Sequence, residues 1–186
     1  MARQWTVSIN HGFEGSVNGN WFPWLKRELT ARGITVATRQ MPDAQWPSWP
    51  AWKDAMSEML PAVGPGNIIV AHSLGCLTVL KWLTECHPDA EIAGGVLVSG
   101  FAEPLPELSL PASFFTTPLD ASRLKGHWTV ISARNDALVP HALTRKLAEK
   151  IGADFVAFEE GGHFMAEEGY TEFPFVLKCV ENLAGL

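Results

Sequence analysis

Long apolar runs, paired cysteines and positive charge are all scarce in this 186-residue chain. No apolar stretch approaches the roughly 20 residues needed to cross a bilayer, and the first residues run into a strand-like segment without the apolar core of a signal peptide. We therefore expect no membrane partner and a cytoplasmic location. The 14 Lys and Arg are outnumbered by 20 Asp and Glu, for a formal charge of −6. This balance argues against a nucleic-acid partner.

The three cysteines, Cys76, Cys86 and Cys179, show none of the spacings of a metal site. A small, odd number is typical of reduced thiols in the cytosol, and we expect all three to be small apolar core residues on helices. Phosphate-binding signatures are missing as well, because neither Gly-x-Gly-x-x-Gly nor Gly-Lys-Ser/Thr occurs. The sequence therefore predicts neither a metal nor a nucleotide cofactor.

What the chain does contain is apolar surface to bury. Hydrophobic residues make up 47% of the sequence and charged residues 18%, which predicts one globular domain over residues 1–186 with a substantial core. Six short segments are rich in valine and isoleucine and nearly continuous in hydrophobicity, as expected of strands buried on both faces. These segments are Trp5–Asn10, Ile34–Arg39, Asn67–Ala71, Gly94–Gly100, His127–Ala133 and Asp154–Glu159.

Helical patterns separate the predicted strands. The first two are expected to end near Gly33 and Gly64, because glycine commonly follows a helix C-terminus. Alternating strands and helices predict an α/β fold: a doubly wound, mostly parallel six-stranded sheet with helices on both faces. The proline-rich segment Phe101–Leu119 falls outside this alternation and is expected to be a long loop over the carboxyl edge of the sheet. The expected helices span residues 21–32, 49–63, 74–86, 141–151 and 170–183.

The most informative stretch is Ala71–Gly75, which lies between an apolar strand and a helix-like run. This is the layout of a nucleophile elbow, a tight turn that presents a serine between a strand and a helix. The elbow needs small residues two before and two after the serine, because the two backbones crowd one another there. Gly75 meets this need, and Ala71 is one methyl group larger than the usual glycine. The sequence predicts Ser73 as the nucleophile.

A serine becomes nucleophilic when a base takes its proton and a carboxylate orients that base. In folds of this type the acid and then the base follow the serine, each at the carboxyl end of a later strand. Asp136 and His163 occupy such places. Taken singly, Asp136 could shape a turn or cap a helix, and His163 could be a loop histidine bound to backbone. Their common order and common edge favour a triad of Ser73, Asp136 and His163.

Two backbone N–H groups are expected to stabilise the developing oxyanion. Leu74 N–H follows the nucleophile at the start of a helix. The loop after the first strand should supply the second, and Phe13 N–H is the candidate because Gly12 allows a close approach. Donation by Gly12 itself is left open. A glycine loop of this kind also resembles a phosphate cradle, but its motifs are absent.

Aromatic residues offer a less specific signal. Trp46, Trp49 and Trp52 recur every third residue, which is ordinarily a sign of core packing. The functional alternative places some of them in a pocket wall near the elbow. The pocket residues expected on that alternative are His11, Gly12, Phe114, Phe115, Trp46 and Trp49.

These features resemble the α/β-hydrolase superfamily and, more closely, the small capless serine hydrolases typified by retinoblastoma-binding protein 9. The resemblance covers nearly the whole chain and implies a minimal fold with strand order 2-1-3-4-5-6 and a Ser73, Asp136, His163 triad. Two departures are Ala71 in place of glycine and Asn10–Phe13 in place of the family's Pro-Gly start of the first loop. Further matching segments are 41–43, 69–75, 96–99, 114–118, 139–140 and 162–164.

We therefore expect an esterase-like serine hydrolase that acts, without a cofactor or metal, on a small-molecule acyl substrate. Esters, thioesters and amides are all compatible with the sequence, which also leaves the oligomeric state open. A second hypothesis is a binding or scaffold protein that keeps the triad but has little turnover. A third is a metal hydrolase that uses His11, Asp136 and His163 as ligands.

Overall fold

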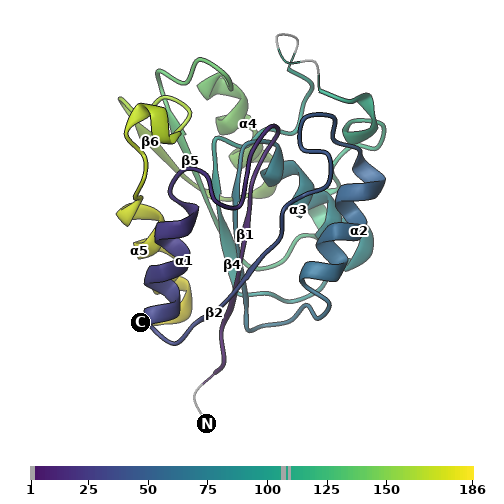
Figure 1. Cartoon of the computed structure of the whole chain (residues 1–186). Helices are drawn as coiled ribbons and strands as arrows, with labels where there is room; N and C mark the ends of the chain where they lie inside the picture. Colours follow the sequence, from purple (N-terminus) through teal and green to yellow (C-terminus); the bar gives the residue numbers. More distant parts are fainter. Residues whose placement is uncertain (1–2, 106–107, 109) are drawn as a thin grey trace.

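The computed structural model of the chain describes residues 3–105, 108 and 110–186. Six strands form one sheet in the order β2-β1-β3-β4-β5-β6, and all five neighbouring pairs are parallel (Figure 1). This arrangement confirms the predicted doubly wound sheet and the order that the resemblance implied. The strands are β1 (Thr6–Asn10), β2 (Thr35–Thr38), β3 (Asn67–His72), β4 (Gly94–Val98), β5 (His127–Ala133) and β6 (Asp154–Phe158).

Helices cover both faces of the sheet, as Figure 1 shows. On one face lie α1 (Phe22–Ala31) and α5 (Pro174–Ala184). On the other lie α2 (Trp49–Met59), α3 (Leu74–Cys86) and α4 (His141–Ile151). Successive side chains of a strand point to opposite faces, so Val70 packs with the first group of helices and Ala71 with the second. Every residue of β3 and β4 is buried, which explains their continuous hydrophobicity.

Two helix boundaries differ from the sequence prediction by more than one residue, and proline accounts for both. The second helix was expected to run to residue 63, but α2 ends at Met59, just before Leu60 and Pro61. The residue before a proline is sterically disfavoured in the helical conformation. The last helix was expected from residue 170, but α5 begins at Pro174, whose fixed φ and missing N–H suit a first turn.

The cysteines are free thiols on helices, but the prediction that all three are core residues was wrong. Cys76 is buried, Cys179 is partly buried, and Cys86 is exposed at the end of α3. None of the helices in the described residues is long and apolar enough to span a bilayer.

The carboxyl ends of the parallel strands all meet at the upper edge of the sheet in Figure 1. The segment expected as a loop at 101–119 contains the short 3-10 helix η1 (Ala112–Phe114). Residues 106, 107 and 109 of that segment lie outside the described residues. Two other 3-10 helices are η2 (Ala121–Arg123) and η3 (Ala166–Glu168). Loops from several parts of the chain therefore converge on one edge, which is where open α/β sheets place their ligand sites.

Candidate active site

Ser73 occupies the single residue between β3 and α3. Its backbone has φ 55° and ψ −128°, a conformation that L-residues rarely adopt. Tight packing holds it there: a Cβ at Gly75 would lie 2.6 Å from the carbonyl oxygen of His11. Ala71 is fully buried in the core beneath α3, so its extra methyl group is accommodated. The predicted elbow geometry is present in the fold.

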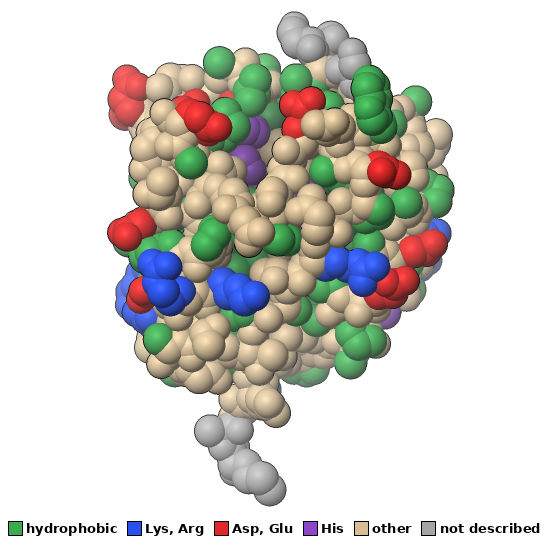
Figure 2. Space-filling view, in the orientation of Figure 1, with side chains coloured by type: hydrophobic (Ala, Val, Ile, Leu, Met, Phe, Trp, Pro, Cys, Tyr) green, Lys and Arg blue, Asp and Glu red, His purple; other side chains and the backbone are tan. Residues whose placement is uncertain are grey.

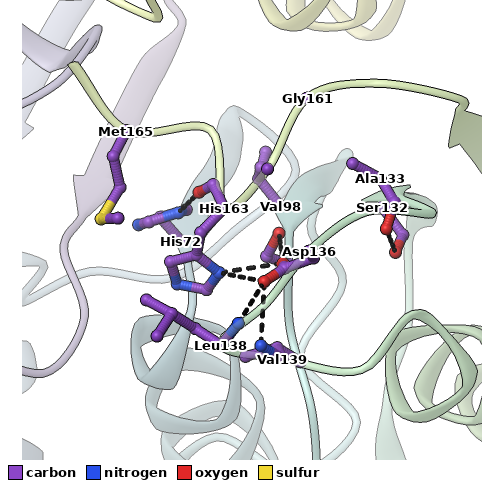
Figure 3. A network of polar contacts seen from close by, with 12 residues as sticks. His72, Val98, Ser132, Ala133, Asp136, Leu138, Val139, Gly161, His163 and Met165 are labelled. Carbon is purple, nitrogen blue, oxygen red and sulfur yellow. Dashed lines mark hydrogen bonds and ion pairs between the residues drawn. The ribbon is translucent and has the colours of Figure 1, made fainter. Parts of the chain in front are cut away.

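Asp136 lies in the turn after β5, and its carboxylate is surrounded by hydrogen-bond donors (Figure 3). Oδ1 accepts from the N–H groups of Leu138 and Val139 at 2.9 Å each, and Oδ2 accepts from Ser99 Oγ at 2.8 Å. Burial by itself would raise the pKa of this carboxyl. The hydrogen bond and charge of His163, together with these other donors, outweigh burial and hold the pKa of Asp136 below its ordinary value.

His163 lies in the loop between β6 and α5, with its side chain 5% exposed. Its Nδ1 lies 2.9 Å from Asp136 Oδ2 and 3.2 Å from Oδ1. Because the carboxylate is an acceptor, Nδ1 carries the proton of a neutral ring and Nε2 is left as the free acceptor. Ser73 and His163 line the same cavity, and within the described residues no hydrogen bond joins the two.

Leu74 and Phe13, the residues expected to supply the oxyanion donors, line this cavity as well. Among the described residues, neither Leu74 N–H nor Phe13 N–H has a hydrogen-bond acceptor. Gly12 brings the first loop against the elbow: a Cβ there would lie 2.8 Å from Ser73 Cβ and 3.1 Å from Leu74 N. Glycine is therefore required for the first loop to pack this closely against the elbow.

His11 lines the cavity as predicted, but both of its ring nitrogens are engaged. Nε2 accepts from the N–H of Met41 at 2.9 Å, so Nδ1 carries the proton and donates to the carbonyl of Gly12 at 2.8 Å. Burial lowers the pKa of His11. The neutral His11 ring thus holds the first loop in place through these two hydrogen bonds. Within the described residues, no three His, Cys, Asp or Glu side chains are grouped as metal ligands.

The cavity has a volume of about 430 Å³, within the range of small-molecule sites. Figure 2 shows the hollow with histidines at its base and acidic side chains beside it, while lysines and arginines gather lower on that face. Of its described lining, Glu14 and Glu167 carry negative charge and none is Lys or Arg. Apolar side chains on the wall include those of Phe13, Phe101, Leu108, Leu110, Leu138 and Met165.

Four expected pocket residues do not line this cavity. Phe114 is buried between Trp49 and Trp52, with ring centroids 5.9 and 5.5 Å away, so these rings form core. Phe115 stacks behind Phe101 at 6.5 Å, and Phe101 is the ring that reaches the cavity. Trp46 is 82% exposed and belongs to neither core nor pocket wall. Spacing alone could not separate these three environments.

Polar residues that sequence reasoning did not single out surround the acid and base. Ser99 is fully buried and binds Asp136. Asn135 Oδ1 accepts from the N–H groups of Gly161 and Gly162 at 3.0 and 2.9 Å. His72, the last residue of β3, donates a hydrogen bond to the carbonyl of His163. All three share one signal: each follows or ends a strand at the same edge of the sheet.

Comparison with known proteins shows which family the chain belongs to. A model described as "Serine hydrolase" matches residues 7–182. YdeN of Bacillus subtilis (strain 168) is 35% identical over 173 residues, 91% of each chain. The crystal structure of that gene product has a TM-score of 0.93 at 33% identity, covering 98% of this chain and 100% of that one.

Two further relatives are more distant. Serine hydrolase RBBP9 of Rattus norvegicus is 24% identical over 182 residues, 95% of this chain and 92% of that protein. Mouse alpha/beta hydrolase domain-containing protein 10 shares the fold, with a TM-score of 0.70 at 13% identity over 97% of this chain and 89% of that one. The chain therefore belongs to the serine hydrolase family of the α/β-hydrolase superfamily and is a hydrolase.

Proposed function

We propose that the chain hydrolyses small, uncharged carboxylic esters through a triad of Ser73, His163 and Asp136. The observation that carries this proposal is the 2.9 Å contact between His163 Nδ1 and Asp136 on the cavity that Ser73 also lines. An Nδ1–H tautomer leaves Nε2 to accept the proton of Ser73 Oγ. The positive φ of Ser73 is the torsion that a nucleophile elbow needs.

The reaction then follows from where the donors and acceptors lie. Ser73 Oγ attacks the ester carbonyl as His163 takes its proton, and the oxyanion binds the N–H groups of Leu74 and Phe13. The tetrahedral intermediate collapses, and His163 gives its proton to the leaving alcohol. Water, deprotonated by His163, then attacks the acyl-enzyme. His163 returns this proton to Ser73 Oγ as the carboxylic acid product leaves. Asp136 orients the imidazole and stabilises its charged form.

The cavity lining supports the choice of substrate. Apolar side chains favour an apolar acyl group through burial worth roughly 25 cal/mol per Å². Glu14 and Glu167, with no cation in the described lining, disfavour a negatively charged substrate. Thioesters and amides react by the same steps, but a leaving group that carries phosphates or carboxylates fits this lining poorly.

The test is labelling with a fluorophosphonate, which phosphonylates an activated serine, together with hydrolysis of short-chain neutral esters. We expect one label per chain, located on Ser73 by mass spectrometry, and no label or turnover in Ser73→Ala. Ser122→Ala, at an exposed serine of η2 outside the cavity, is the matched control and should behave as wild type.

Labelling that persists in Ser73→Ala would refute the proposal. A label on Ser73 without serine-dependent turnover of any neutral ester, thioester or amide would instead favour the binding or scaffold hypothesis.

A further inference from the structure

Two side chains from outside this loop, those of Asn135 and His72, hold the backbone around His163. Asn135 Oδ1 accepts hydrogen bonds from Gly161 N–H and Gly162 N–H. His72 Nε2 lies 2.7 Å from the carbonyl oxygen of His163. Backbone groups of three consecutive residues, Gly161, Gly162 and His163, are therefore fixed from outside their own loop. Asn135 directly precedes Asp136 in the chain and His72 directly precedes Ser73, so each support adjoins another member of the proposed triad.

His72 acts in this contact as a neutral donor. A carbonyl oxygen can only accept, so Nε2 of His72 carries the proton. Burial, followed by the nearby charge of His163, lowers the pKa of His72 to about 3, while Asp136 opposes this shift and His11 adds to it. The centroids of the His72 and His163 rings lie 4.6 Å apart. Figure 3 draws both residues from close by. His72 thus keeps one tautomer across the neutral pH range.

The hydrogen bond between His72 and His163 lies only one residue along the chain from Ser73. Ser73 is the next residue after His72, and its backbone is locked by the close packing of Gly12 and Gly75. A short hydrogen bond from His72 to the main chain of His163 therefore sets the distance between Ser73 and the imidazole. Misplacing a reacting group by about 1 Å can cost a hundredfold in rate, so such a link has kinetic consequences.

We propose that His72 is a positioning residue that holds His163 in register with Ser73 through its Nε2–H hydrogen bond. This inference rests on the proposed function, because it assumes that His163 is the base. The competing explanation is packing alone, since the His72 ring also meets Trp21 and Phe22 edge-on at 6.3 and 6.1 Å. The two explanations differ in which substitutions are tolerated.

Three variants at His72 distinguish a role as hydrogen-bond donor from a role in packing alone. The amide nitrogen of His72→Gln reaches about as far as Nε2 and can donate to the same carbonyl. The amide of His72→Asn stops at the place of Nδ1, and His72→Leu has no donor. Gln and Asn impose a similar cost for burying an amide, so they form a matched pair. The readouts are kcat and KM for a neutral ester, the melting temperature and the rate of fluorophosphonate labelling.

We expect His72→Gln to keep kcat within about threefold of wild type, whereas Asn and Leu lose roughly 10- to 100-fold in kcat and labelling rate with KM within twofold. The pH profile of His72→Gln should match that of wild type, because His72 is already neutral there. Equal kcat in Asn and Gln, or losses that track the melting temperature in all three variants, would overturn the inference. Wild-type turnover that is absent, or independent of Ser73, would instead reject the proposed function.

Discussion

The elbow of Ser73 and the loop of His163 are positioned by different means. Around Ser73, backbone packs on backbone: Gly75 meets the carbonyl of His11, and Gly12 meets the carbonyl of His72. Around His163, the supports are side-chain hydrogen bonds from residues far away in the sequence, Asn135 and His72. One half of the site tolerates no added atom, and the other depends on particular donors and acceptors.

This contrast predicts how each half fails. Adding a methyl group at a close backbone contact forces the backbone to shift, and no rotamer change can relieve it. Removing a hydrogen-bonding side chain leaves the fold intact but lets the base loop move. The following substitutions test the two halves in order of expected effect.

The largest effect is expected at the acid. In Asp136→Asn the amide can donate to His163 Nδ1 and hold the wrong tautomer, so kcat should fall by about 10⁴. The melting temperature should change little, because the side-chain oxygen can still accept from Leu138 and Val139 N–H. Ester hydrolysis at saturating substrate measures this, with the exposed Asp120→Asn as control. Loss of less than tenfold would argue against Asp136 as the acid.

Gly12→Ala tests the elbow side. The new Cβ would lie 2.9 Å from the carbonyl oxygen of His72 and 3.1 Å from Leu74 N, which displaces an oxyanion donor. We expect kcat to fall 10²- to 10³-fold, the usual cost of one such donor. Gly64→Ala is the matched control, because a Cβ there meets nothing within 4 Å. If both variants kept wild-type kcat, the first loop would have no part in oxyanion binding.

Acid stability tests His72 on the base side. Its folded pKa of about 3 lies below the unfolded value of 6.5, so its contribution to stability is present above pH 6.5 and is lost as pH falls towards 3. Between pH 7 and 5 this amounts to about 2 kcal/mol, or roughly 4–8 °C in melting temperature. His72→Gln should remove that part of the acid sensitivity. Asp136 does not contribute between pH 7 and 5. Its pKa is lowered from the ordinary value of 3.8, so its contribution to stability is lost only at pH values below that.

The same melting curves would contradict a buried, neutral His72 if wild type and His72→Gln lost stability equally between pH 7 and 5. His11, whose pKa is lowered as well, contributes in both proteins and cancels in the difference.

The smallest effect concerns charge at the rim of the cavity. An ester that carries a carboxylate on its acyl chain should have kcat/KM about threefold to tenfold below that of a neutral ester of equal size, because exposed charges interact weakly in water. Glu14→Gln and Glu167→Gln should each reduce the difference in kcat/KM between the two esters by about twofold. Added salt should reduce this difference as well. A preference for the anionic ester would reject the substrate class.

The fold could be predicted because its signals are local. Each strand is a short apolar run, and alternation with helices dictates a parallel sheet whose carboxyl ends share one edge. Ser73, Asp136 and His163 could be placed at that edge for the same reason. The two helix ends that differ show the limit of the hydrophobic pattern: near Pro61 and Pro174 it is proline that sets the boundary.

The pocket wall could not be predicted in the same way. Phe101 lines the cavity and Phe115 stacks against Phe101, and no local pattern in the sequence distinguishes these two rings. Ser99 and Asn135 were missed for a related reason: their partners are distant in sequence. Among the pocket predictions, His11 and Gly12 line the cavity, and both belong to the loop directly after β1.

The strand order also bears on how the protein acquires activity as it folds. Ser73 follows β3 and His163 follows β6, and β4 and β5 lie between these strands in the sheet. Parallel neighbours cannot pair through a short hairpin, so each pairing closes a long loop and forms slowly. Ser73 and His163 therefore come together only when four strands are in register. Recovery of ester hydrolysis after dilution from denaturant would accordingly report completion of the sheet rather than formation of any single helix.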